Sequence, residues 1–180
     1  MRPAKDEPSI LVAFEYEVWM FFRTRALLAA HVSNEHQESK VLDNALEESA
    51  LIHTRILAEV LLNRCSEVGD VTLDDLVPSW RELPGAGGAI RQLRQTYGRP
   101  NENGTPCWQL NKMLAHFTAV RSSSFDYSDL RAKLDPLITK ALRAIARELN
   151  SPKINQFLEA HTSDSAQDGH DPPGAPAAAD

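Results

Sequence analysis

Apolar residues recur every three or four positions over the first third of the chain, which is the spacing of one face of an α-helix. One such stripe, interrupted at Arg25, predicts a helix over residues 9–32, with Pro8 and Ser9 as start signals. Its members are Ile10, Phe14, Val18, Phe21, Leu28 and Val32. A second stripe predicts a helix over residues 37–65, and its members are Leu42, Ala45, Leu46, Ser49, Ile52, Ile56 and Val60. We therefore expect two long antiparallel helices.

The rest of the chain predicts shorter helices separated by turn-forming residues. Thr72 and Asp75 have the spacing of a capping box before a short helical turn. The glycine-rich stretch 85–88 predicts a loop, Pro106 suits a first helical turn, and Pro136 falls in early turns or marks a kink. The helices expected here span about 89–97, 107–122, 126–150 and 152–161. Because no segment alternates like a strand, the predicted fold class is an all-α helical bundle.

Composition separates a helical body from a tail. Residues 162–180 are rich in Pro, Gly, Ala and Asp and predict a disordered tail, whereas residues 1–161 predict a single helical domain. The 180 residues are 42% hydrophobic and 24% charged, which is typical of a soluble globular protein. Cys65 and Cys107 form no CxxC pair, and there is no signal-peptide pattern or long uncharged apolar run. We expect a cytoplasmic protein without a membrane span.

The net charge of -6 averages over unlike parts of the chain. Residues 1–80 carry 7 basic and 14 acidic side chains, residues 81–153 carry 12 and 6, and residues 154–180 carry none and 5. A basic second half can meet a phosphate backbone, so the overall charge does not exclude RNA. Pairing between the two halves, within one domain or across a dimer, is the alternative.

The segment from Leu110 to Arg121 holds the residues best suited to chemistry. On a helix Lys112 and His116 share a face, whereas Asn111 lies roughly 140° around the axis from His116. A histidine near its unperturbed pKa can act as general acid or base at neutral pH, and Lys112 and Arg121 can hold a phosphate. The alternative is that His116 packs at a helix interface and hydrogen-bonds one neighbour.

This segment resembles the signature of HEPN-type helical domains, many of which are RNases of toxin–antitoxin and phage-defence systems. The signature is an Arg, a polar residue, three variable residues and a His, and Asn111, Lys112 and His116 occupy these positions. The resemblance implies metal-independent RNA cleavage at a site completed across a homodimer. His116 would be the acid or base, Asn111 would orient the phosphate, and Arg121 or Arg55 would stabilise it.

The Asn111 position departs from the family pattern. A neutral amide cannot replace a fixed cation, so either Arg121, Arg55 or Lys112 substitutes for the missing Arg, or the domain binds RNA without cutting it. The chain up to about residue 150 also resembles a group of bacterial helical proteins of unknown function, which supplies no activity.

His53 and Arg55 are the next candidates for a substrate-binding site. His53 is expected to face the bundle, and Arg55 shares a helix face with Glu59, as in a ladder of ion pairs. In the functional interpretation, His53, Arg55 and His116 converge in one polar pocket. Structural hydrogen bonding of these buried groups is the alternative.

Metal and phosphate-loop motifs are missing from the sequence. Asp74 and Asp75 fit a helix start, and there is no Glu-x-x-His, His-x-x-x-His or CxxC, so we expect no metal and no cofactor. A small basic and aromatic patch is expected instead, made of Arg91, Arg94 and Arg99 with Tyr97 to stack on a base. A solvated helix face is the alternative.

These patterns favour a HEPN-like helical protein that binds or cleaves RNA in a bacterial defence or toxin context. The alternative is a non-catalytic interaction module that binds a partner protein. A small-molecule-binding bundle is the third alternative, and it would have an enclosed pocket between the first two long helices.

Overall fold

The computed structural model describes residues 7–31, 37–64, 67, 70–115 and 127–161. All regular elements in these ranges are helices, which confirms the all-α bundle. They are α1 (Glu7–Ala30), α2 (Gln37–Leu61), α3 (Leu73–Leu76), the 3-10 turn η1 (Trp80–Glu82), α4 (Ala86–Tyr97), α5 (Pro106–Ala115), α6 (Tyr127–Leu149) and α7 (Pro152–Ala160). The predicted tail, residues 162–180, lies outside the described residues.

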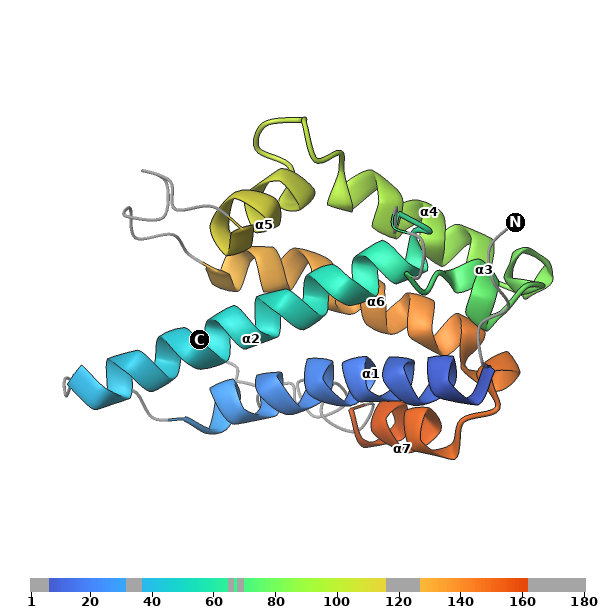
Figure 1. Cartoon of the computed structure of the whole chain (residues 1–180), viewed down its shortest axis with the longest axis horizontal. Coiled ribbons are helices and arrows are strands. Elements are labelled where there is room, and N and C mark those ends of the chain that lie inside the picture. Colours follow the sequence, from blue (N-terminus) through green and yellow to red (C-terminus); the bar gives the residue numbers. More distant parts are fainter. Residues whose placement is uncertain (1–6, 32–36, 65–66, 68–69, 116–126, 162–180) are drawn as a thin grey trace, which may run out of the picture.

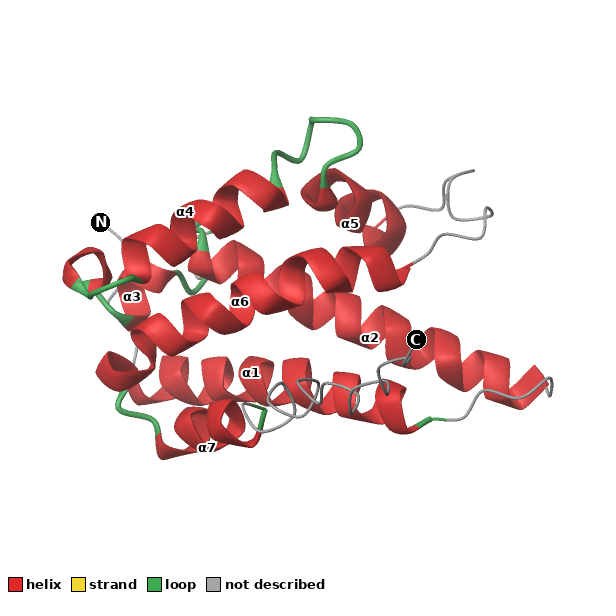
Figure 2. Cartoon of the chain, turned by 180° about the vertical axis from the view of Figure 1, so that it is seen from behind, coloured by secondary structure: helices red, strands yellow, loops and turns green. Residues whose placement is uncertain are grey.

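The two long helices α1 and α2 run antiparallel along one side of the bundle (Figure 1). α6 packs against α2 and lies between α4 and α1 (Figure 2). α5 packs against α2, and α7 packs against α1. Among the described helices, none has a stretch that is both long enough and apolar enough to cross a membrane.

The first stripe of apolar residues is confirmed as the inner side of α1 from Ile10 to Phe21, whereas Leu28 is half-buried and Val32 lies outside the described residues. Phe14, Val18 and Phe21 are buried at 0–2% exposure in the core. α2 ends four residues earlier than the predicted helix, at Leu61, because Asn63 adopts a left-handed conformation (φ 54°). The Arg64 N–H turns back to the Glu59 carbonyl at 2.9 Å, as at other helix ends that close with a left-handed residue.

The second stripe is wrong for most of α2, and only its last member, Val60, is buried in the core. Leu42 and Ile52, which it placed on the inner side, are exposed, and the buried row is instead Ala50, Leu51, Thr54, Leu57, Ala58 and Leu61. α2 carries two apolar rows side by side, and contacts with α1, α5 and α6 determine which row is covered. The other row, with Ile52 and Ile56, is left at or near the surface.

The loop expected at residues 85–88 is also wrong, because only Gly85 lies outside the helix. Gly85 has φ 81° and precedes the first turn of α4, which contains Ala86, Gly87 and Gly88. Ala86 and Ala89 are buried against the core, so tertiary packing stabilises a turn whose glycines disfavour it. The helix therefore begins three residues before the predicted start.

The shorter elements follow their sequence signals more closely. The Asp75 carboxylate accepts hydrogen bonds from the Thr72 N–H at 2.9 Å and hydroxyl at 2.8 Å, which confirms the capping box of α3. Pro136 lies inside α6 and is exposed. At α7, the Ser151 hydroxyl caps the helix through the Ile154 N–H and donates to Glu15 of α1 at 2.6 Å.

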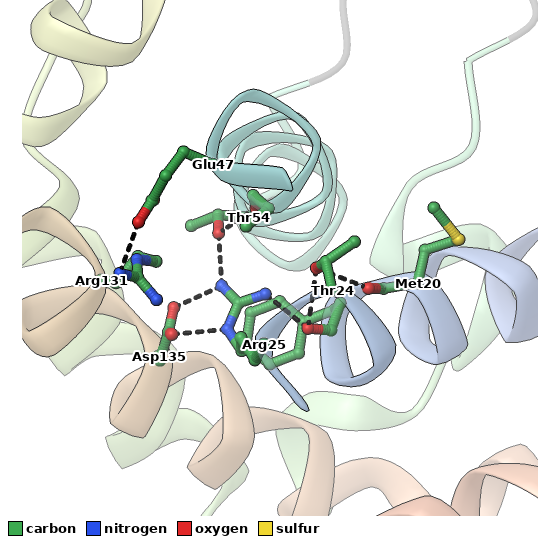
Figure 3. A network of polar contacts seen from close by, with 9 residues as sticks. Met20, Thr24, Arg25, Glu47, Thr54, Arg131 and Asp135 are labelled. Atoms are coloured by element: carbon green, nitrogen blue, oxygen red, sulfur yellow. Dashed lines mark hydrogen bonds and ion pairs between the residues drawn. The ribbon is translucent and has the colours of Figure 1, made fainter. Parts of the chain in front are cut away.

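Arg25, which interrupts the first stripe, ties three helices together (Figure 3). Its guanidinium donates to both carboxylate oxygens of Asp135 on α6 and to the Thr54 hydroxyl on α2. Arg131, one turn before Asp135, pairs with Glu47 of α2 at 2.8 Å. Burial lowers the pKa of Arg25, and Asp135 counteracts this by favouring the charged form. These contacts are structural, since they satisfy a charge inside the bundle.

Candidate functional site

His53 and Arg55 point to opposite sides of α2. Residues two positions apart on a helix are separated by about 200° around its axis, so these two side chains cannot converge. His53 is buried and lies with its Nδ1 2.6 Å from Oε2 of Glu17 on α1. Arg55 donates from Nε to Oε1 of Glu59, one turn further along α2, at 2.9 Å, as its predicted helix face implied.

The two acidic partners line one cleft, even though the two bases do not meet. A cleft of about 280 Å³ lies between α1, α2 and the segment before α3. We call it the acidic cleft, and its lining residues are Ala13, Phe14, Glu17, Ile56, Glu59, Val60, Asp70 and Val71. His53 therefore holds one carboxylate of the cleft and Arg55 another. A bundle that binds a small molecule was expected to have an enclosed pocket between the two long helices, and this cleft lies there but is open to solvent.

The chemistry of the acidic cleft combines negative charge with an apolar lining. Three of its residues are acids, Glu17, Glu59 and Asp70, and the other five are apolar. Among the described residues, no group of three or more histidine, cysteine or acidic side chains is placed to hold a metal ion. Because acids and apolar side chains line it together, the cleft suits an organic cation with an aliphatic portion.

An exposed apolar surface adjoins this cleft. Val12, Tyr16 and Trp19 follow one another on α1 at helical spacing, and Ile52 lies on α2, one turn before Ile56. Their exposed fractions are 59, 51, 42 and 43%. The Tyr16 ring is 6.0 Å from that of Trp19 and 6.1 Å from that of His53, centroid to centroid. We call these four residues the apolar face.

The large apolar side chains that are exposed in the described part of the chain all belong to α1 or α2. The others are Leu27, Val41 and Leu42. A helix with apolar residues on all sides is normally covered on all sides, and among the described elements α1 packs mainly against α2 and α7, with a smaller contact to α3. This concentration on one helix pair distinguishes the apolar face from the scattered apolar residues of an ordinary surface.

The HEPN-like segment is described only as far as Ala115. His116 and Arg121 lie outside the described residues, so their predicted roles are not tested by the structure. Asn111 is half-buried on α5, and its amide lies 3.8 Å from the Cys107 sulfur. Lys112 is half-buried in the last described turn of α5.

Tyr97 does not belong to a surface patch, contrary to the sequence-based expectation. Its side chain is fully buried at the end of α4, close to Cys107 of α5. Burial, and then Cys107, raises the pKa of Tyr97 far above its ordinary value, and burial also raises the pKa of Cys107. Because its ring is fully buried, Tyr97 cannot stack on a base. Because the Cys107 thiol stays protonated at neutral pH, Cys107 is a poor nucleophile.

Basic side chains remain exposed on α4 and α6. Arg91 and Arg94 lie on α4, which carries no acid, and Lys140 and Arg147 lie on the neighbouring α6. The Lys140 ammonium donates to Gln92 of α4 at 2.8 Å, which joins the two helices at the surface. None of these four cations lines the acidic cleft.

Sequence reasoning missed the acidic cleft because its acids are far apart in the chain. Glu17 lies in an apolar run and Asp70 in an irregular segment, and neither has a motif. The only local signal was the pair of glutamates at positions 15 and 17, which breaks the most apolar part of α1.

Comparisons with known proteins add no family to this site. The chain matches no protein-family model, no curated protein and no solved structure.

Proposed function

We propose that this protein is a helical interaction module whose docking surface for a partner protein is the outer side of α1 and α2. The observation that carries the proposal is the concentration of exposed large apolar residues on these two helices. Exposed aromatic side chains at the centre of a surface are typical of interface anchors, and Tyr16 and Trp19 lie in contact there.

The catalytic alternative receives less support from the described residues. His53 and Arg55 are each engaged with a carboxylate, and neither points toward the other. Asn111 is half-buried beside Cys107. A module that binds without cutting also agrees with the neutral Asn111 at the position where the HEPN pattern has an Arg.

Site-specific photo-crosslinking tests the docking surface. A photoreactive amino acid replaces Trp19 in one variant and Gln95, an exposed residue of α4, in another, and each is irradiated in the cells that naturally contain the protein. We expect position 19 to give a discrete crosslinked species of one partner and position 95 to give none. The same yield at both positions, or no product at position 19, would contradict the proposal.

RNA binding is the second candidate function, and the exposed cations of α4 and α6 favour it. Arg91, Arg94, Lys140 and Arg147 lie on neighbouring helices and can contact successive phosphates without any base-specific geometry. In this proposal His116 supplies the acid or base if RNA is cut, and a homodimer completes the site, as the HEPN resemblance implies.

Fluorescence anisotropy with a labelled single-stranded RNA measures this second function. Replacing Arg91 and Arg94 by Ala should weaken binding and lower the salt dependence by about one ion per lost phosphate contact. The matched control replaces Arg23 and Lys40, exposed cations of α1 and α2, with the same change in charge. Equal losses in both double variants would mean that the α4–α6 surface is not the RNA site.

Cleavage and dimerisation are measured with the same protein. We expect His116→Ala to abolish any RNA cleavage while RNA affinity is kept, and sedimentation to report a dimer. Equal cleavage by the wild-type chain and by His116→Ala would remove His116 from catalysis.

A further inference from the structure

We infer that the partner presents a basic amphipathic helix to the apolar face and inserts one lysine or arginine side chain into the acidic cleft. This inference rests on the proposed docking function and specifies the chemistry of the partner. In this interaction the acidic cleft selects a partner with a positive charge, and the apolar face supplies most of the contact area.

The first step is that the face and the cleft form one continuous surface. Tyr16 precedes Glu17 on α1, and its ring packs edge-on against His53, which holds Glu17 in place. Ile52 lies one turn before Ile56, which lines the cleft. A helix laid over the apolar face therefore passes the mouth of the cleft, and its side chains can reach in.

The second step is the size of the cleft. Its volume of about 280 Å³ lies just below the range of roughly 300–1,000 Å³ that is typical of pockets for drug-sized ligands. The cleft is open toward solvent, on the surface between two long helices, rather than enclosed in the core. These properties suit a single side chain that projects from a docked segment better than a cofactor.

The third step is the charge. Glu17, Glu59 and Asp70 bring three carboxylates to the cleft, against the guanidinium of Arg55 and the imidazole of His53. His53 is hydrogen-bonded to one oxygen of Glu17, and Arg55 donates to one oxygen of Glu59. These two bonds orient the carboxylates of the cleft. A lysine or arginine entering past the apolar lining would bury its aliphatic stem against Phe14 and Ile56 and place its cation among the acids.

The same charge disfavours other occupants at this place. The phosphates of RNA and the headgroups of an anionic membrane would be repelled by an acidic cleft, so a basic peptide is the occupant that matches both charge and apolarity. A second copy of this chain, or its own residues 1–6, which contain Arg2 and Lys5, are the other possible occupants. The experiment separates them from a peptide partner.

The test uses two designed 18-residue helical peptides with identical leucine faces, one with lysines and the other with glutamates on the polar side. Fluorescence anisotropy measures the binding of each labelled peptide to the full chain. We expect the lysine peptide to bind and the glutamate peptide not to bind. In a Glu17→Gln/Glu59→Gln double variant, affinity for the lysine peptide should fall about tenfold, the loss expected for charge-assisted hydrogen bonds.

The matched control is Glu102→Gln/Glu159→Gln, which removes two exposed acids far from the cleft and changes the net charge equally. It should leave the affinity within a factor of two. Circular dichroism and the thermal midpoint show whether each variant is folded. If the cleft variant is unfolded, Asp70→Asn alone is used, and an affinity equal to that of the wild type overturns the inference.

The remaining outcomes separate this inference from the proposed function. If both peptides bind equally and Trp19→Ser weakens both, the docking face stands and the charge selection is overturned. If neither peptide binds while crosslinking at position 19 succeeds, the basic partner is again overturned. If the chain forms a concentration-dependent dimer that the Glu17→Gln/Glu59→Gln variant does not form, the cleft binds a second copy of the chain. If deletion of residues 1–6 increases peptide binding, the cleft binds the chain's own N-terminal residues. Either result overturns the inference.

Discussion

Arg25 shows what one residue contributes to this bundle and how little of that the sequence reveals. The sequence showed only that a charge interrupts the apolar stripe of the first helix. Its partner, Asp135, lies 110 residues further along the chain, and no local pattern connects the two. Pairing over such a separation depends on how α1 and α6 pack, which periodicity does not determine.

Loss of one partner of this pair should destabilise the fold. The Arg25 and Asp135 side chains are only 14 and 22% exposed, so Asp135→Asn leaves a buried guanidinium without its counter-charge. We expect the free energy of unfolding to fall by about 3 kcal/mol, measured by urea denaturation. Lys133→Ala, which breaks the exposed pair with Asp129, should change it by less than about 0.5 kcal/mol. Similar losses in both variants would contradict a structural role for Arg25.

At the scale of elements, the sequence predicted which segments form helices better than it predicted which side of each helix is buried. The helices and the capping box of α3 follow from periodicity and from start and stop signals that act within a few residues. The buried row of α2 was mispredicted because two apolar rows fit helical spacing equally well. Which row is covered depends on α5 and α6, helices that come later in the chain. The row that was expected to be buried supplies Ile52 and Ile56 to the candidate site instead.

Substitutions at two glycines test where α4 begins and ends: Gly88 lies in its first turn, and Gly98 follows its last residue. Gly88 lies in the first turn with open space where a Cβ would be, so Gly88→Ala should raise the free energy of unfolding by about 0.5–1 kcal/mol. Gly98, which ends the helix, has φ 71°, and a Cβ there would collide with Thr105. Gly98→Ala should therefore lower it by more than about 1 kcal/mol. The same sign for both changes in chemical denaturation would show that the start of α4 is misplaced.

At the scale of the whole molecule, the acidic cleft and a set of exposed cations lie on different elements, although Arg131 and Lys153 pair with Glu47 and Glu15 across the two halves of the sequence. The acidic cleft and the apolar face belong to α1 and α2, whereas the exposed arginines and lysines of α4 and α6 lie elsewhere on the bundle. The sequence predicted this division of charge but not the cleft, because Glu17, Glu59 and Asp70 meet only after α1 and α2 pair. The sequence placed the candidate site on the HEPN-like segment, which includes α5. The concentration of exposed apolar residues on α1 and α2 could not be predicted, because it depends on how the helices pack.

Oxidative footprinting of the unmodified chain tests most directly whether α1 and α2 form a docking surface. Hydroxyl radicals generated in the native cells and in the purified protein label side chains according to their exposure, and mass spectrometry reads Tyr16, Trp19 and the core residue Trp80. We predict that Tyr16 and Trp19 are oxidised readily in the purified protein and protected in cells, while Trp80 reacts slowly in both. Equal oxidation of Tyr16 and Trp19 in cells and in the purified protein would contradict the account.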